Sequence, residues 1–514
     1  MFAYIMRRIG TLGVILLGSS FLLYNLAAIS GDPIGELKIS QDPRAKQQII
    51  ALTRELQLNI PPPFRYFLWL RGVLGIFVGK LDLGSTRTGE SVGTAILSAI
   101  PTTLRLVFTA SILAMVLGIS VGIVTALRQY SKFDYSMTFV SFLLFSLPIF
   151  WVAVLLKQFM AIQFNNWLDK PTISLGALVI IGVVIGLIVA SIAGGARRKS
   201  YSIFSAVALS TMVVLWILQK INWFLEPGFG PIFFFIASIG IAFGVTQLSV
   251  GINNKSALRS SITMAVVGLV FYYPTKWAFK LSNQTLVLLA MAALTLLSAV
   301  LVSLFFAKID KIAIIRTSIL TGIFMGLIRL LDQLMSTWPR FISTDAINYR
   351  PVPTVGQANS LLEPGDYWVT TLDLLMHLIL PTVALTAISF AGYIRFARGT
   401  MLEVLNQDYI RTARAKGLSE RTVIMRHAFR NTLIPLSTII VVDFAGIIGG
   451  AIITEKVFGW KGMGTLFNMA INSFDLNLLM GVFFLTGTLS LMANLVADLL
   501  YSALDPRIRT GSGA

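Results

Sequence analysis

Long apolar runs recur along the whole 514-residue chain, and they constrain its fold more than any other feature. A helix needs about 20 apolar residues to cross a bilayer core, where no water can satisfy its backbone. These runs predict an all-α integral membrane protein with about twelve transmembrane helices. Their approximate limits are 9–29, 103–127, 136–162, 172–194, 202–219, 231–251, 260–275, 284–306, 312–333, 371–394, 432–454 and 475–503.

The overall composition excludes several classes of protein. Hydrophobic residues make up 56% of the chain and charged residues only 12%, against about 25% in an ordinary soluble domain. The net charge of +18 lies in clusters between apolar runs, which favours a membrane protein and argues against a nucleic-acid partner. The chain has no cysteine, and His377 and His427 stand far apart, so we expect no metal site. No phosphate-binding G-x-x-x-x-G-K-[ST] motif occurs, and we expect neither a cofactor nor enzymatic activity.

The placement of lysine and arginine predicts the topology. With the N-terminus inside, 22 Lys and Arg residues fall on the inner side and eight in the short outer loops. Cytoplasmic loops carry this kind of excess. Twelve spans then return the C-terminus to the inside, so both termini are predicted to be cytoplasmic.

The largest outer segment covers residues 30–100. Asp42 and Pro43 precede an amphipathic stretch to Leu56, which predicts a capped helix that the prolines at 61–63 end. A second amphipathic stretch, 64–78, is predicted to lie at the membrane surface. The alternative is a packed outer cap that binds no ligand.

Ionisable residues inside the membrane are expensive and often functional. Asp443, near the centre of the run 432–454, is the clearest example in this chain. We interpret it as a possible pathway residue. The alternative is a side chain that a neighbouring helix satisfies.

The sequence of the basic inner segment 395–430 predicts two short helices. Residues 408–416 predict a short helix that Gly417 ends in the left-handed conformation. Ser419 can cap a second helix, 420–429, before Pro435 starts the next span. The small residues Ala413 and Ala415 would admit another protein, and the arginines could pair with its carboxylates. The alternative is a positive loop that only fixes topology.

This segment resembles the cytoplasmic EAA loop of binding-protein-dependent ABC importer permeases. Arg411-Thr412-Ala413 occupy the positions that name the motif, and Gly417 follows at the expected spacing. Arg411 stands where the motif has its first glutamate. Any ion pair at this position therefore has the opposite sign to a pair made by the family's glutamate. The resemblance implies that the loop docks on the ATPase subunit. It assigns coupling to Arg411, Thr412, Ala413, Arg414, Ala415, Lys416, Gly417, Glu420 and His427.

Further stretches are similar to the dipeptide/oligopeptide permeases of the first-permease type. They keep the family's order and spacing: Tyr4–Ile9, Gly31–Pro33, Leu83–Ser85, Ile100–Leu104, Ser146–Trp151, His377–Pro381, Arg426–Pro435 and Asp505–Arg509. Lys461 departs from the pattern, because the family usually has proline there.

The resemblance implies a subunit that moves peptides across the cytoplasmic membrane by alternating access. It implies as partners a second permease, two ATP-binding-cassette ATPases, an extracytoplasmic substrate-binding protein, the peptide and membrane lipid. Import of nickel or another small solute is the alternative, and an ion-coupled secondary carrier is a further one. A scaffold that only docks other proteins is a third possibility.

The resemblance covers only part of the chain, which predicts three regions. Residues 1–163 form the first part of a six-helix permease core, and 344–514 form the second part with the coupling loop 395–430. Residues 164–343 are an inserted six-helix annex. Since its runs carry almost no charge, we expect it to face lipid and to contribute no second pathway. Deleting 172–333 is then expected to leave uptake measurable.

Overall fold

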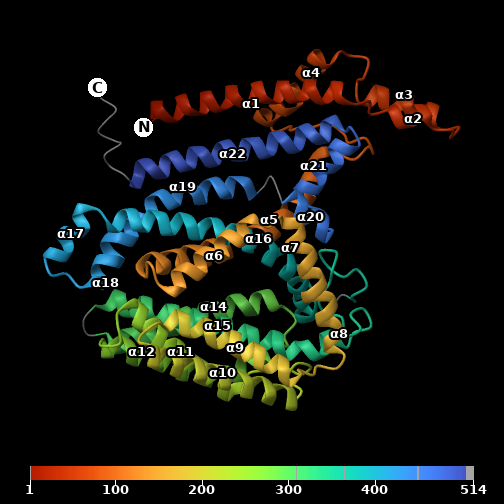
Figure 1. Ribbon diagram of the computed structural model, residues 1–514. Coiled ribbons are helices and arrows are strands. Elements are labelled where there is room, and N and C mark those ends of the chain that lie inside the picture. The colour runs from red at the N-terminus through yellow and green to blue at the C-terminus, as the bar shows by residue number, and fades with distance from the viewer. Residues whose placement is uncertain (1, 308–309, 364, 448–450, 505–514) are drawn as a thin grey trace. The chain divides into compact units, whose positions relative to one another are not determined.

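The computed structural model describes residues 2–307, 310–363, 365–447 and 451–504, which are mostly helical (Figure 1). Within these ranges, the one β feature is an isolated bridge between Ser85 and Ser91. Nine described helices are long and apolar enough to cross a membrane, and two bent pairs raise this number to eleven. The all-α membrane class is therefore confirmed. The predicted run 432–454 crosses 448–450, and these three residues and the tail 505–509 lie outside the described ranges.

Contacts divide the chain into two compact units. Unit 1 contains Met1–Ile162, Pro353–Gln357 and His377–Ala514, and unit 2 contains Gln163–Val352 and Ala358–Met376. Each unit is described by itself.

In unit 1, α22 packs along α1 and α19, and α5 packs against α19, α21 and α22. Small residues let the backbones of α5 and α16 approach closely. A Cβ atom on Gly118 would lie 2.6 Å from Tyr393, and one on Gly122 would lie 2.7 Å from the carbonyl of Ile394. The helices of unit 1 begin and end at α1 Phe2–Ser30, α5 Val92–Leu127, α6 Lys132–Ser146, α7 Ile149–Leu156, α16 Tyr367–Leu405 (from His377), α17 Asp408–Ala415, α18 Glu420–Thr422, α19 Phe429–Ile447, α20 Ile452–Phe458, α21 Met463–Asn472 and α22 Leu476–Leu504.

The predicted straight span 136–162 is wrong in shape. The helical axis bends by 101° between α6 and the helix that starts at Ile149. Pro148 has no N–H to donate and forces the preceding residue out of the helical region, so Leu147 is extended at φ −82° and ψ 128°. Beyond α7, the wide π-helical turn η2 covers Lys157–Gln163.

The outer segment forms α2 Gly35–Ile39, α3 Ala45–Glu55, α4 Pro62–Leu74 and the 3₁₀ turn η1 Gly75–Val78. The prediction that the prolines end α3 is wrong. They start α4 instead, because Pro62 at the first helical position needs no N–H. Tyr66 and Trp69 of α4 are buried against Tyr24 of α1 and Met480 of α22. The Tyr66 hydroxyl lies 2.8 Å from the Ser20 hydroxyl. This face of α4 is therefore packed, whereas Phe64 and Phe77 are exposed.

Unit 2 contains three helical hairpins, α9–α10, α11–α12 and α14–α15, and α15 packs against α11, α12 and α14. Buried hydroxyls join α11, α12 and α15 at short range: Thr246 donates to Ser261 over 3.1 Å, and Ser260 lies 2.7 Å from Ser318. The helices are α8 Phe164–Leu168, α9 Leu175–Ala193, α10 Arg197–Lys220, α11 Gly230–Ser249, α12 Lys255–Val270, α13 Tyr272–Ala278, α14 Gln284–Phe306 and α15 Lys311–Ile342.

Two predicted runs of unit 2 differ from the structure. The run 260–275 bends by 48° between α12 and α13, and the run 312–333 continues as α15 to Ile342. The expectation of almost no charge inside the insertion has one exception. Arg329 and Asp332 of α15 are both buried and form an ion pair of 3.2 Å.

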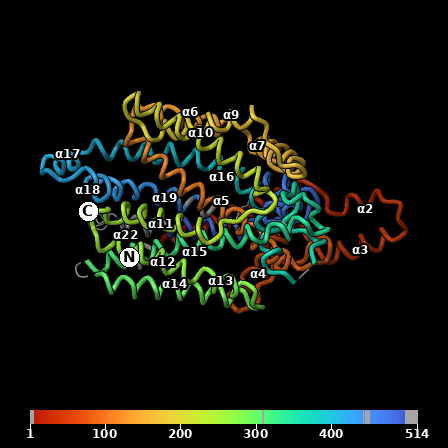
Figure 2. Tube along the Cα trace, turned by 90° about the horizontal axis from the view of Figure 1, so that it is seen from below, coloured from red at the N-terminus to blue at the C-terminus, as the bar shows by residue number. Residues whose placement is uncertain are grey.

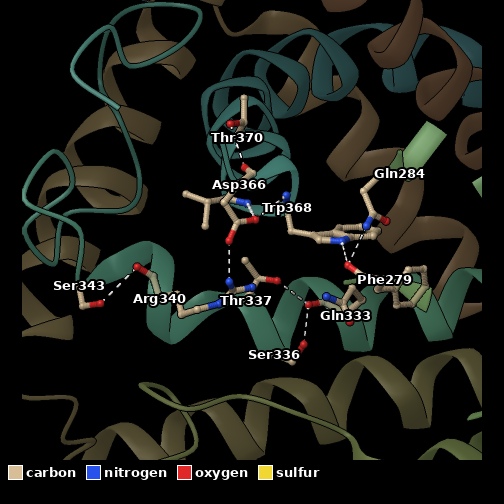
Figure 3. A network of polar contacts seen from close by, with 11 residues as sticks. Phe279, Gln284, Gln333, Ser336, Thr337, Arg340, Ser343, Asp366, Trp368 and Thr370 are labelled. Carbon is tan, nitrogen blue, oxygen red and sulfur yellow. Dashed lines mark hydrogen bonds and ion pairs between the residues drawn. The ribbon is translucent and has the colours of Figure 1, made fainter. Parts of the chain in front are cut away.

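A polar network fixes the first turn of α16 within unit 2 (Figure 3). Asp366 accepts from the backbone N–H of Trp368 over 3.0 Å and from Arg340 of α15 over 2.5 Å. The indole of Trp368 donates over 3.0 Å to the carbonyl of Phe279, which also accepts from Gln284 over 2.8 Å. This network therefore links the end of α15, the α13–α14 turn and the start of α16.

Candidate functional site

The predicted coupling loop is a helical hairpin in unit 1. α17 ends at Ala415, and Gly417 has a φ of +75°, as the sequence predicts for a left-handed stop. Ser419 accepts from the backbone N–H of Thr422 and caps α18, as also predicted. The chain then turns back through the π-helical turn η3, Val423–Ala428, into α19.

The prediction that Pro435 starts the next span is wrong, because Pro435 lies inside α19. Residues from Glu420 to Ile447 form one helical run that only η3 widens. A proline removes a single backbone donor, and a membrane helix packed on its neighbours tolerates that loss. The second arm of the hairpin is therefore continuous with a predicted membrane helix.

The hairpin is packed onto unit 1 by one apolar face. Ile410 and Ala413 are buried with Met401 of α16 and Val423 and Ala428 of η3. The prediction that Ala413 admits another protein is therefore wrong, because residues three apart on α17 share its inward face. Ala415 is exposed. These contacts with α16 and η3 attach the hairpin to unit 1.

The outward face of the hairpin is polar and basic. Arg411, Thr412, Arg414, Lys416, Gly417 and Glu420 are exposed, and His427 is half-buried. Arg414 donates two hydrogen bonds to Glu420, over 3.2 and 2.7 Å. These bonds lower the pKa of Glu420, and Glu420 in turn raises the pKa of Arg414. Arg411 lies 3.6 Å from Asp408, a looser contact.

The hairpin lies at one end of unit 1. Both views place α17 and α18 at the same end as the start of α1, while α2 and α3 extend from the opposite end (Figures 1 and 2). α20 and α21 lie towards that opposite end in Figure 1.

A buried carboxylate that the sequence did not single out organises that opposite end. Glu455 of α20 is fully buried and accepts from the Thr103 hydroxyl of α5 and from the backbone N–H of Thr465, each over 2.8 Å. The Thr103 hydroxyl also accepts from the backbone N–H of Met463 over 2.8 Å. Lys461, where the resemblance breaks, is exposed. The sequence analysis recognised the stretch Ile100–Leu104, which contains Thr103, but nothing local to it pointed to Glu455.

Comparison with known proteins identifies the family. The family model described as "Binding-protein-dependent transport system inner membrane component" matches residues 182–510. The chain belongs to this family. It is therefore a multi-pass component of a transport system in a membrane.

Three curated relatives of this inner membrane component are permease proteins. The oligopeptide transport system permease protein OppB of Mycobacterium tuberculosis is 43% identical over 145 residues, which cover 28% of this chain and 45% of the relative. The oligopeptide permease protein AppB of Bacillus subtilis is 43% identical over 136 residues, 26% of this chain and 43% of the relative. The dipeptide permease protein DppB of Escherichia coli K12 is 43% identical over 147 residues, 29% of this chain and 42% of the relative. The chain thus spans less than half the length of each relative.

Within this transport component, Asp443 is the second predicted site. Its side chain is exposed, and the buried Tyr393 of α16 makes a side-chain hydrogen bond with it. A neighbouring helix therefore contacts the carboxylate without covering it. Its role in a pathway stays a prediction, as does the coupling role of the hairpin. Among the described residues, no group of three or more His, Asp or Glu side chains is placed to hold a metal ion.

Proposed function

We propose that this chain is the transmembrane permease subunit of an ATP-binding-cassette importer that takes up peptides. The relatives, which are named as oligopeptide and dipeptide permease proteins, support this cargo. Its partners would be a second permease, two ATPase subunits and an extracytoplasmic binding protein. ATP hydrolysis would then take place on the ATPases, and both termini of this chain would be cytoplasmic.

The observation that carries the proposal is the hairpin α17–Gly417–α18. Its basic face is exposed, while its apolar face is packed on α16 and η3. A groove on an ATPase with surface carboxylates could pair with Arg411 and Lys416. Arg414 is already paired with Glu420, so that pair would stiffen the hairpin. Exposed pairs of this kind contribute little energy by themselves.

The packing suggests how motion would travel. Displacement of the hairpin would be passed to α16 through Met401 and, through η3, to α19. These two helices also carry Tyr393 and Asp443, which contact each other. ATPase closure would therefore shift the helices that hold this pair. Such switching needs two discrete arrangements whose populations ATP biases.

Reconstitution tests the proposal. The chain, its partner permease, both ATPases and the binding protein are placed in proteoliposomes, and uptake of labelled di- and oligopeptides is measured. We expect uptake that requires ATP and persists when ionophores collapse all ion gradients. Uptake that follows the gradient would establish a secondary carrier, and ATP-dependent uptake of nickel without peptide uptake would establish the other alternative.

Topology gives a second prediction. A tag inserted after Lys199, in the first turn of α10, should report the cytoplasm, because Arg197, Arg198 and Lys199 form a basic cluster. A tag near Gly228, before α11, should report the outside, since α10 lies between the two sites. Thiol labelling suits this test, because the chain has no cysteine of its own. Labelling of both sites from one side of the membrane would contradict the twelve-span topology.

The inserted annex gives a third prediction. The deletion must include α15 up to its last residue, Ile342, because a cut at 333 would divide this helix. A variant that lacks 172–342 and carries a flexible linker is expected to keep ATP-coupled uptake measurable, if 164–343 is an annex and not a pathway. A variant that assembles with both ATPases yet transports nothing would assign these helices to the mechanism.

A further inference from the structure

A small, open and mostly apolar pocket of about 80 Å³ lies inside unit 2. α11, α12, α14 and α15 line it, and its walls include Met264, Met291, Leu294 and Met325. Gly326 contributes no side chain and leaves part of the space empty, whereas a Cβ atom on Gly268 would lie 2.4 Å from Met325 and one on Gly322 would lie 2.9 Å from Thr295. A Cβ atom on Gly326 would meet nothing within 4 Å.

One charged side chain borders this pocket. Arg329 is only 4% exposed and lies about 10 Å along α15 from Gly322, at 1.5 Å per residue. Its Nε donates to Thr275 over 3.0 Å, and its Nη1 donates to Asp332 over 3.2 Å. Among the described residues, its Nη2 has no hydrogen-bond partner.

Asp332 does not depend on this arginine alone. It accepts from the Tyr272 hydroxyl over 2.7 Å and from the backbone N–H groups of Phe229 and Gly230 over 2.9 and 3.3 Å. These neutral hydrogen-bond donors therefore also stabilise the negative charge of Asp332. The guanidinium of Arg329 also lies 4.7 Å from the ring centre of Tyr272 and 4.9 Å from that of Phe279. Its Nη2 still has no hydrogen-bond acceptor, which is unfavourable for a buried donor.

We propose that the pocket binds an anionic phospholipid of the surrounding membrane, with a phosphate oxygen on Nη2 of Arg329 and part of an acyl chain between α12, α14 and α15. A charge-assisted hydrogen bond would satisfy the spare donor, and the apolar walls suit methylene groups. Leu294 and Phe271 at the pocket are more than a third exposed, so a lipid chain can reach it. In the predicted topology Arg329 lies near the outer end of its span and Gly322 deeper. The phosphate headgroup would thus lie closer to the outer membrane surface than the acyl chain, as it does for a lipid of the outer leaflet.

Lipid titration of the purified, delipidated full chain tests this site. Bound lipid is counted by native mass spectrometry for phosphatidylglycerol, for phosphatidylcholine and, in a separate arm, for inorganic phosphate alone. We expect phosphatidylglycerol to bind about tenfold more tightly than phosphatidylcholine, because the choline cation offsets the phosphate charge beside Arg329, and we expect phosphate alone not to bind. Equal retention of the two lipids would overturn the role of Arg329, and binding of phosphate alone would show an anion site without a lipid chain.

Two leucine variants separate the pocket from the general surface. Gly326→Leu places a side chain in the open space and is expected to weaken phosphatidylglycerol binding about tenfold. Gly244→Leu, on α11 and also without a Cβ contact within 4 Å, should bind like the wild type. Wild-type binding by Gly326→Leu, or equal loss in both variants, would overturn the proposal. Arg329→Gln should remove the preference for the anionic lipid, and Gly326→Leu keeps the test decisive if Arg329→Gln does not fold.

Discussion

Replacing Gly417 with valine is expected to lower ATP-coupled uptake by more than about tenfold. The residue has a φ of +75°, a conformation that costs an L-residue about 1–2 kcal/mol and a β-branched residue more. A Cβ atom there meets nothing within 4 Å, so the backbone conformation and not a clash is responsible. Valine should therefore shift the turn between α17 and α18 and misplace the basic face, while the buried contacts of Ile410 and Val423 hold the hairpin on unit 1.

The control for this prediction is Gly417→Asn, because asparagine tolerates the left-handed region better than other residues with a side chain. Uptake, ATPase association and the stability of the purified chain are measured for both variants. We expect asparagine to restore most of the uptake and both variants to remain folded, with valine the less stable of the two. Normal uptake by Gly417→Val would remove the hairpin from the coupling mechanism.

Replacing Gly462 with alanine is expected to destabilise the chain by about 2–4 kcal/mol, through overpacking and a broken buried hydrogen bond. A Cβ atom there would lie 2.4 Å from the Glu455 Oε1 and equally close to the Thr103 hydroxyl. Neither group can move without losing a partner, since Glu455 is fully buried and Thr103 is only 1% exposed. We expect a clearly lower midpoint of thermal unfolding in detergent.

Two comparisons make this prediction specific. Gly10→Ala in α1 is the matched control, because its Cβ atom meets nothing within 4 Å and alanine favours the helix. Thr103→Val removes the hydroxyl that links Glu455 to Met463, so combining it with Gly462→Ala should cost less than the sum of the two. Equal stability of Gly462→Ala and Gly10→Ala, or strict additivity in the double variant, would contradict the packing described for Glu455.

Most helices were predictable from sequence, because a membrane helix satisfies its own backbone and its apolar length is a local property. The runs 172–194, 231–251 and 284–306 match α9, α11 and α14 closely for this reason. The stop at Gly417 and the cap at Ser419 are local as well, because each depends on one residue's backbone preference or side-chain reach. The family followed from such local motifs in their order along the chain.

Only the tertiary structure decided which of these residues are covered. Ala413 looked available to a partner, but the packing of α17 on α16 and η3 buries it. Pro148 and Pro435 are both prolines in helical runs, yet one separates α6 from α7 and the other lies inside α19. Glu455 and Thr103 are separated by 352 positions, so only the packing of α20 on α21 and of α21 on α5 makes them partners. Apolar length and backbone preference act within a few residues, and therefore the sequence alone determined the helices and the hairpin turn. Burial and long-range hydrogen bonds depend on which helices pack together. For that reason only the tertiary structure decided the burial and the partners of Glu455 and Arg329, and which face of the hairpin is buried.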